Sequence, residues 1–450
     1  MRAYSLALLC TLAAACGSID ANEVTDAGII TGDGPGAQTD VAPPPLPNAH
    51  VRGIVYAPNG RSVTPPITVM NALVYVTDNA PAPIPQNVYC ERCTELPSGA
   101  HFVKTDEYGA FDLQIWDGAY IMVIQKGQFR IVRPIVVGKD ATLEVPPEDT
   151  TLPSRSSSDG NDTIPRIALL MGSYDKLEDL FAKMGLADLN GSNVQWGANT
   201  QFDVYDNGAY STLPPSGSPY LKGTALELLS SLEKMKQYHI IFVPCSSENE
   251  EVVKNATVKQ NVKEYVKLGG KYYVADWSYD YLLQVYKSRD DGPVVNFDSY
   301  DGSYGSANVV PGFDSLGHAV DADLYKWLEA QQTGWGGDSL TLVENFDMIT
   351  SLDEGYVGDD PENGPVYQKA DVIVEGPHVG DEGTSWKALP ASSIYPLTIG
   401  FPSGCGRVLY TTYHTVGSMG DGHTGIEVQE RILIYLIMEI GVCQSGPILE

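Results

Sequence analysis

The chain has 450 residues, of which 43% are hydrophobic, and this composition excludes a disordered protein because it can form ordinary buried cores. At about one domain per 100 to 200 residues, the length predicts two or three domains. The 28 Lys and Arg residues against 57 Asp and Glu give a formal charge of −29, which repels phosphate backbones and anionic head groups. Nucleic acid is therefore not expected as a partner.

Residues 1–16 have the pattern of a targeting segment. Arg2 is its one charged residue, residues 3–12 are apolar, and three alanines precede Cys16. The pattern resembles a bacterial lipobox, in which the cysteine is acylated; an ordinary secretory signal with an incidental cysteine is the alternative. Residues 17–48, rich in Gly, Pro, Asp and Ala, predict a disordered tether. We expect an extracytoplasmic protein held at the outer membrane or cell surface by a lipid anchor.

Residues 49–149 predict a small β-sandwich. Apolar residues alternate in short segments separated by Gly-containing turns, at residues 52–56, 72–77, 110–115, 120–125 and 131–137. Three runs carry a resemblance: V-R-G-I-V-Y-A-P-N-G from Val51, A-L-V-Y-V from Ala72 and T-D-E-Y-G-A-F from Thr105. They resemble the carboxypeptidase regulatory-like, transthyretin-like domain. The resemblance implies a domain that packs against other domains, presents them or binds a partner, and that catalyses no reaction itself.

Cys90 and Cys93 form a C-x-x-C pair within this region. Such a pair can be a redox centre, half of a metal site with His101 as the nearest further ligand, or a disulfide. Because an oxidising compartment is expected, we favour a Cys90–Cys93 disulfide. Cys405 and Cys443 are a second candidate pair.

The polar segment 150–164 predicts a domain boundary. From residue 165 to 445, apolar strands alternate with helical segments, which predicts a parallel sheet covered by helices on both faces. The expected strands are 166–171, 240–243, 272–275, 340–343, 372–374, 397–399 and 408–411, and the longest expected helices are 321–332 and 427–440. The predicted fold is multidomain β plus α/β, a small β-sandwich followed by a flavodoxin-like parallel-sheet domain.

Three runs in this second region resemble the class I glutamine amidotransferase-like superfamily: residues 239–245 (H-I-I-F-V-P-C), 263–282 and 406–414 (G-R-V-L-Y-T-T-Y-H). The whole chain resembles uncharacterised secreted bacterial lipoproteins with a carboxypeptidase regulatory-like domain. The superfamily's nucleophilic cysteine stands in a strained G-x-C-x-G turn. Here the corresponding strand runs into residues 276–279 (D-W-S-Y), so the nucleophile is missing.

Polar residues follow several of the predicted strands, and ligands of open α/β sheets bind beyond the carboxyl ends of the strands. The catalytic candidates at this edge are Asp276, His414 and Cys245, with Ser278 and His423 as weaker ones and Cys245 favoured as a buried, reduced residue. By family analogy Trp277, Tyr279 and Asp280 are candidates for binding a sugar.

The sequence predicts neither a metal site nor a cofactor. It contains no H-x-H or H-E-x-x-H spacing around its histidines. The acidic loops 203–208, 298–305 and 353–364 lack the EF-hand pattern, so we expect solvated loops, with weak Ca²⁺ binding as the alternative.

Two functions remain open from the sequence. The favoured one is a non-catalytic, surface-anchored lipoprotein that binds a protein or carbohydrate ligand in adhesion or at the envelope. The alternative is a hydrolase of extracellular or envelope carbohydrate or peptide, with Asp276 and His414 in its site.

Overall fold

The computed structural model describes most of the chain from residue 46 onward. The described residues are 46–90, 95–96, 100–208, 220–246, 250–307, 312–331, 337–338, 340–360, 363–377, 393–415, 425–440 and 448–449. The predicted signal peptide, Cys16 and nearly all of the predicted tether lie outside this set, as do Cys93, His423 and Cys443. Among the described residues, no helix combines the length and the apolar composition needed to cross a bilayer.

The first strands form two sheets that pack face to face, and the five predicted strands are all present. One sheet has the order β5-β1-β8, with β1 at Ala49–Ile54, β5 at Ala110–Ile115 and β8 at Thr142–Glu144. The other has the order β4-β2-β6-β7-β9, with bounds His101–Lys104, Leu73–Thr77, Gly118–Lys126, Phe129–Val137 and Asp162–Thr163. Val51 and Leu113 from the first sheet share a buried cluster with Val74 and Ile124 from the second. Alternating apolar residues thus supply the sandwich core.

The segment expected to be a boundary, residues 150–164, belongs to the sandwich structurally. Leu152 is buried and its backbone N–H donates to the Tyr56 carbonyl, while β9 pairs with β7. Polar composition concealed this because the segment is ordered by hydrogen bonds of its backbone and of polar side chains such as Ser157, and a polar sequence alone does not distinguish this order from a loop.

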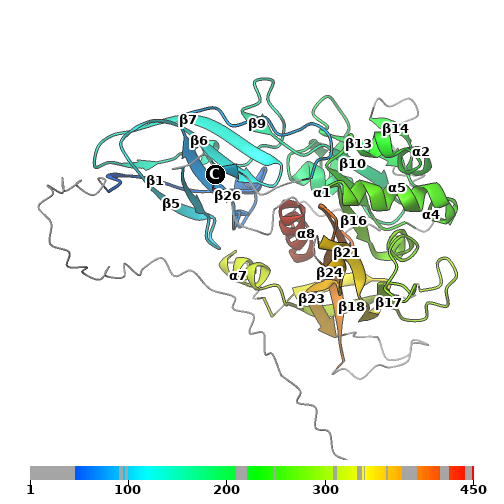
Figure 1. Ribbon diagram of the computed structural model, residues 1–450. Helices are drawn as coiled ribbons and strands as arrows, with labels where there is room; N and C mark the ends of the chain where they lie inside the picture. The colour runs from blue at the N-terminus through cyan, green and yellow to red at the C-terminus, as the bar shows by residue number, and fades with distance from the viewer. Residues whose placement is uncertain are drawn as a thin grey trace, which may run out of the picture. The chain divides into compact units, whose positions relative to one another are not determined.

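The second region is built on one large mixed sheet among the described residues (Figure 1). Its order is β14-β13-β10-β15-β16-β25-β24-β23-β18-β19. In that order the bounds are Leu221–Thr224, Phe202–Asp206, Ile167–Met171, Ile240–Val243, Lys271–Ala275, Gly406–Thr411, Ile394–Ser403, Asp371–Pro377, Phe313–Ala319 and Leu340–Asn345. Strands β14 to β25 pair in parallel, whereas β25 to β19 pair antiparallel. The prediction of a purely parallel sheet is therefore wrong for the second half.

Both faces of the parallel half are buried, as its all-apolar strands require. In β15, Ile240 and Phe242 join one core cluster and Ile241 and Val243 join the other. Helices α1 (Leu177–Lys183), α7 (Ala322–Ala330) and α8 (Val428–Glu439) contribute to the first cluster. Helices α2 (Ala225–Leu229), α3 (Leu232–Met235), α4 (Glu250–Lys254), α5 (Ala256–Lys267) and α6 (Asp280–Leu283) contribute to the second.

Short ribbons and turns complete the described elements. They are β3 (Glu95–Leu96) with β26 (Ile448–Leu449), β11 (Asp188–Asn190) with β12 (Asn193–Gln195), β17 (Val295–Phe297) with β20 (Ile349–Leu352), β21 (Gly355–Asp360) with β22 (Gly364–Gln368), and the 3₁₀ turns Gly60–Ser62, Pro147–Asp149 and Asp276–Ser278.

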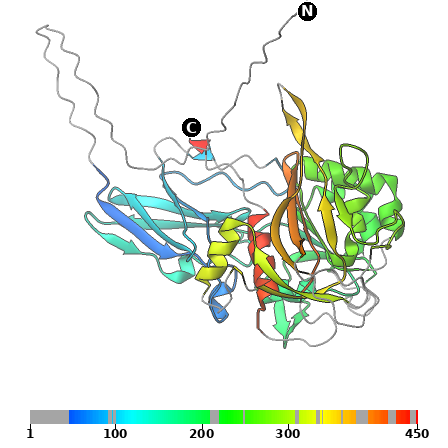
Figure 2. The ribbon, with the colours of Figure 1, turned by 90° about the horizontal axis from the view of Figure 1, so that it is seen from below.

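Helices α7 and α8 join the sandwich to the large sheet. In Figures 1 and 2, α7 (yellow) and α8 (red) lie against the sandwich strands, and the core cluster of α8 is continuous with that of the sandwich. Polar contacts reinforce this: Arg431 donates to the Pro65 carbonyl and Trp327 to the Thr68 carbonyl, both at 2.9 Å. Residues from Leu46 onward accordingly form one compact unit.

A disulfide ties the same two regions together at a different place. Cys405 lies in the two-residue turn of the β24–β25 hairpin, and it bonds to Cys90 of the sandwich region across 315 residues of sequence. The predicted Cys90–Cys93 and Cys405–Cys443 pairs are therefore wrong. Spacing favoured the local pair, whereas the fold brings Cys90 and Cys405 to a Cα separation of 5.1 Å, within the range for a disulfide.

We predict that Cys405→Ser lowers the free energy of unfolding by roughly 2–5 kcal/mol, because the covalent link restricts the unfolded chain. Denaturant unfolding of the variant and the wild type measures the difference. Cys93→Ser is the matched control and should leave stability unchanged. An equal loss in Cys93→Ser, or a Cys90–Cys93 peptide in a non-reducing digest, would restore the local pairing.

His239 also links the sandwich region to the large sheet. Its Nδ1 accepts from the Arg166 backbone N–H and its Nε2 donates to the Pro85 carbonyl, each at 2.8 Å. These bonds fit the neutral ring. Burial lowers the pKa of His239 from 6.5 to about 4, with the Pro85 carbonyl opposing the shift and Lys271 and Arg166 adding to it.

Because this pKa is lower in the folded than in the unfolded chain, the unfolded chain takes up the proton first as the pH falls. The His239 contribution is therefore complete above about pH 6.5 and is lost toward pH 4, by up to about 1.4 kcal/mol per pH unit. We predict that His239→Gln is less stable at pH 7 and loses less stability on acidification. An unchanged slope in a folded His239→Gln protein would contradict the assignment to His239.

Candidate functional site

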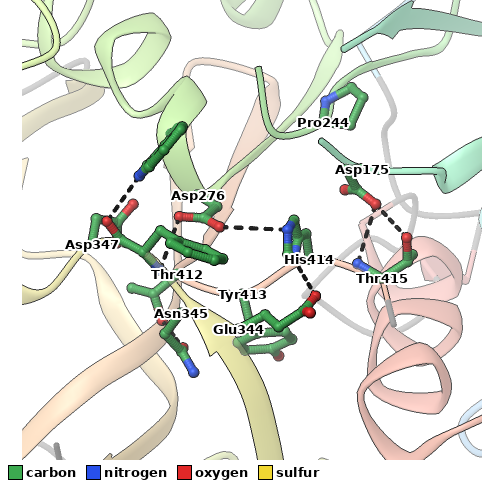
Figure 3. A network of polar contacts seen from close by, with 12 residues as sticks. Asp175, Pro244, Asp276, Glu344, Asn345, Asp347, Thr412, Tyr413, His414 and Thr415 are labelled. Carbon is green, nitrogen blue, oxygen red and sulfur yellow. Dashed lines mark hydrogen bonds and ion pairs between the residues drawn. The ribbon is translucent and has the colours of Figure 1, made fainter. Parts of the chain in front are cut away.

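Four neighbouring parallel strands end at one edge of the large sheet, and a polar side chain follows each strand. Asp175 follows β10, Cys245 follows β15, Asp276 follows β16 and His414 follows β25. The strand ends bring three of the predicted candidates together, since the ligand-type atoms of Cys245, Asp276 and His414 all lie within 4.8 Å of one another. Figure 3 shows Asp276 and His414 facing each other, with Asp175 beyond His414.

The loop that carries Cys245 packs closely on the end of β10. A Cβ atom at Gly172 would lie 2.3 Å from the Cys245 carbonyl oxygen, so only glycine fits there. The same carbonyl accepts from the Tyr174 backbone N–H at 3.3 Å. Close backbone contact thus helps to place the thiol at the sheet edge.

Asp276 occupies the strand-to-helix turn where the amidotransferase resemblance implies a nucleophile. Its φ is +46°, in the left-handed region that is costly for residues other than glycine. Its Oδ1 accepts from the Phe346 backbone N–H at 3.2 Å. Its Oδ2 lies 3.9 Å from His414 Nε2 and has no hydrogen-bond partner among the described residues.

His414 lies between two carboxylates. Its Nε2 faces Asp276 and its Nδ1 lies 3.9 Å from Glu344 Oε2, and neither separation is a hydrogen bond (Figure 3). Within the described part of the chain, Nδ1 has no hydrogen-bond partner. The Gln429 side-chain amide of α8 donates to the His414 carbonyl, which fixes the backbone at this position.

Burial and like charge set the protonation of this cluster. Burial raises the pKa of Asp276 well above 3.8, and the neighbouring Asp347 carboxylate adds to the shift. Burial also raises the pKa of Asp347, although a hydrogen bond from the Tyr410 hydroxyl opposes it. Burial, then Asp276 and Asp175, raise the pKa of the Cys245 thiol well above 9. Cys245 is therefore a protonated thiol, which is a poor nucleophile.

The predicted site residues are largely closed to solvent. Cys245, Asp276 and His414 are 1%, 0% and 1% exposed. Tyr279 and Asp280 are also buried. The Tyr279 hydroxyl accepts from the Ala307 N–H and Asp280 Oδ2 accepts from the Gly305 N–H, so both hold the local loop in place.

The remaining candidates of this turn likewise have partners within the protein. The Ser278 hydroxyl is buried and donates to the Pro244 carbonyl at 2.7 Å, and the half-buried Trp277 donates to the Phe346 carbonyl at 3.0 Å. Ser278 therefore lacks the base that a nucleophile needs. Trp277 packs edge-on against Tyr174 and Phe346 rather than standing alone as a stacking platform.

Sequence reasoning missed three acidic residues around the cluster: Asp175, Glu344 and Asp347. Asp175 accepts from the backbone and hydroxyl of Thr415, next to His414. Glu344 and Asp347 come from the end of the antiparallel strand β19 and the loop after it. The run E-N-F-D after the apolar segment 340–343 was visible; β19 runs in the same direction as β25, four antiparallel pairings away, so its end lies at the same edge of the sheet.

The acidic loops considered for calcium use their carboxylates to close turns. Asp206 accepts from the Gly208 N–H, Asp301 from the Ser303 N–H and Asp360 from the Asn363 N–H. These are the local bonds that Asp commonly makes in turns.

A cavity lies at the opposite end of β25 from His414. It is lined by Ser403, which pairs with Gly406 at the amino end of that strand. Its volume is about 200 Å³, and its walls carry three lysines, one glutamate and three aromatic rings: Lys263, Lys267, Lys287, Glu264, Tyr286, Tyr356 and Phe401.

The charge of this cavity differs from that of the chain as a whole. Lysines outnumber acidic residues on its walls, although the whole chain carries 57 Asp and Glu against 28 Lys and Arg. The Tyr286 hydroxyl is buried and has no hydrogen-bond partner among the described residues. Burial, with Lys259 and Lys263 nearby, lowers the pKa of Lys287.

Comparisons with known proteins yield structural likeness alone. No protein-family model matches the chain, and no curated protein matches it. A cytoplasmic protein from Salmonella typhimurium aligns at 14% identity over 62% of this chain and 99% of its own, with a TM-score of 0.30. A putative ThuA-like protein from Bacteroides uniformis aligns at 12% identity over 62% and 92%, with a TM-score of 0.29.

Proposed function

We propose that the protein is a surface-anchored lipoprotein that binds a small acidic ligand, such as a uronic acid-containing carbohydrate, without turnover. The lysine-lined cavity carries this proposal. Cys16 would hold the lipid, residues 17–48 would act as the tether, and the carboxypeptidase regulatory-like sandwich would act as a spacer.

The cavity has the chemistry that an acidic sugar requires. Ammonium groups from α5 and from the segment after α6 attract carboxylates, while aromatic rings offer apolar surface to the sugar ring. The Tyr286 hydroxyl, which has no hydrogen-bond partner among the described residues, supplies a polar group whose burial without a partner is costly. Because the protein as a whole has a charge of −29, most of its surface repels an acidic ligand, whereas the local lysine cluster attracts it.

The burial of the opposite edge supports binding over hydrolysis. A hydrolase needs substrate and water at its catalytic groups, yet Asp276 and His414 are at most 1% exposed. Burial and the neighbouring carboxylates keep Cys245 as the neutral thiol, so Cys245 does not provide an alternative nucleophile.

We predict that an oligosaccharide of galacturonic acid binds, and that Lys263→Glu with Lys267→Glu weakens binding by at least about tenfold, since attraction becomes repulsion. Isothermal titration calorimetry measures the affinity, and the carboxyl-reduced, neutral oligosaccharide is the ligand control. A Lys222→Glu, Lys234→Glu protein carries the same charge change outside the cavity and should bind normally. Equal binding of the neutral sugar, or no binding by the wild type, would rule out the acidic-ligand proposal.

The anchor is tested separately. Cells fed an alkyne fatty acid should label the wild-type protein, and Cys16→Ser should lose both the label and the membrane fraction. Cys10→Ser, within the same predicted signal peptide, is the matched control and should keep both. A labelled Cys16→Ser protein would show that this residue is not the acylated one.

A further inference from the structure

The cluster at the carboxyl edge of the sheet contains three different side chains of the types that bind transition metals. Cys245, Asp276 and His414 offer one thiol sulfur, one carboxylate oxygen and one imidazole nitrogen within 4.8 Å of one another. They come from three adjacent parallel strands, β15, β16 and β25. All three are at most 1% exposed.

The separations fit a shared ion after small movements. Three atoms within 4.8 Å of one another have a common point no more than about 2.8 Å from each, and zinc bonds to S, N and O are about 2.0–2.3 Å. Each side chain therefore needs to move by less than about 1 Å, which side-chain rotation alone can supply.

An independent feature points into the same space. Asp276 Oδ2 is fully buried, lacks a hydrogen-bond partner among the described residues, and lies 3.9 Å from His414 Nε2. Leaving a buried carboxylate oxygen unpaired is costly, and a bound cation would satisfy it. No Lys or Arg of the described residues forms an ion pair with Asp276; its one near partner of that kind is His414.

The surroundings also match those of metal-bound histidines. Such histidines usually direct their second ring nitrogen toward a carboxylate or carbonyl, which fixes the ring. His414 Nδ1 faces Glu344 Oε2 at 3.9 Å, on the side of the ring away from Asp276 (Figure 3). Asp347 lies beside Asp276 and offers a further buried oxygen without a partner among the described residues.

We propose that Cys245, Asp276 and His414 bind a divalent transition-metal ion of the zinc type. A thiolate with an imidazole selects Zn²⁺ or Co²⁺ over Mg²⁺ and Ca²⁺, which prefer oxygen ligands alone. The site goes beyond the proposed binding function, since it lies at the other end of β25 from the lysine-lined cavity. Because the site is buried, we assign it a structural role, in which the ion holds the ends of the three strands together.

The test uses the full chain without a histidine tag, in a Cys10→Ser, Cys16→Ser, Cys93→Ser, Cys443→Ser background that removes the thiols outside the described residues. After treatment with a chelator, Zn²⁺ is added and unbound metal is removed. Elemental analysis should find about one Zn²⁺ per chain, and the thermal midpoint should rise with added Zn²⁺, because the ion binds the folded state. Co²⁺ should give a thiolate charge-transfer band in the near ultraviolet.

The variants Cys245→Ser, Asp276→Asn and His414→Gln should each bind at least tenfold less Zn²⁺. Thr412→Val is the matched control: it removes a buried hydroxyl near His414, keeps all three ligands and should bind normally. The Co²⁺ band is measured on the protein that keeps all three ligands, so it tests the metal site even if a variant fails to fold.

Absence of both Zn²⁺ and the Co²⁺ band from the folded protein would overturn the site, as would unchanged Zn²⁺ binding in a folded Asp276→Asn variant. Galacturonate binding is measured in the same samples. Its loss in Lys263→Glu, Lys267→Glu, with Zn²⁺ retained, separates failure of the cavity from failure of the metal site.

Discussion

The architecture depends on burying helix α8 on every side. Eleven of its twelve residues, Val428 to Met438, are buried, so an apolar helix of this kind is stable only between two packing partners. The sandwich provides one partner and the large sheet the other. Some of the polar groups on α8 have partners of their own, as in the buried ion pair between Glu430 and Lys183 at 2.7 Å. The link between the two regions is therefore a hydrophobic core rather than a hinge.

Positions of strands were predictable from the sequence, whereas their directions were not. The apolar runs at 240–243 and 408–411 are β15 and most of β25, because a strand buried on both faces shows itself as an unbroken apolar run. Direction depends on the connections. Ser403 and Gly406 face each other across a two-residue turn, and Gly404 has φ of +62°, the signature of a hairpin. Reading S-G-C-G as a turn between strands would have predicted the antiparallel half.

The candidate site was predictable in part for the same reason. Cys245, Asp276 and His414 follow parallel strands, and the rule that such strand ends meet brings them together. Burial was not predictable, since it depends on loops whose packing leaves no local pattern. Glu344 and Asp347 were missed because β19 lies four strands from β25 in the sheet, and the packing that brings its end beside Asp276 and His414 leaves no pattern in the sequence. The cavity near β21 and β24 was missed because its lysines are separated in sequence.

The disulfide between Cys90 and Cys405 has a consequence for what a protease can do to the chain. It closes a covalent ring between two residues separated by 315 positions in the sequence, and the ring includes most of both regions. A protease that cuts once anywhere inside that ring opens it without separating the pieces. Each single cut between the two cysteines leaves the large sheet attached to the sandwich and, through it, to the amino-terminal end of the chain.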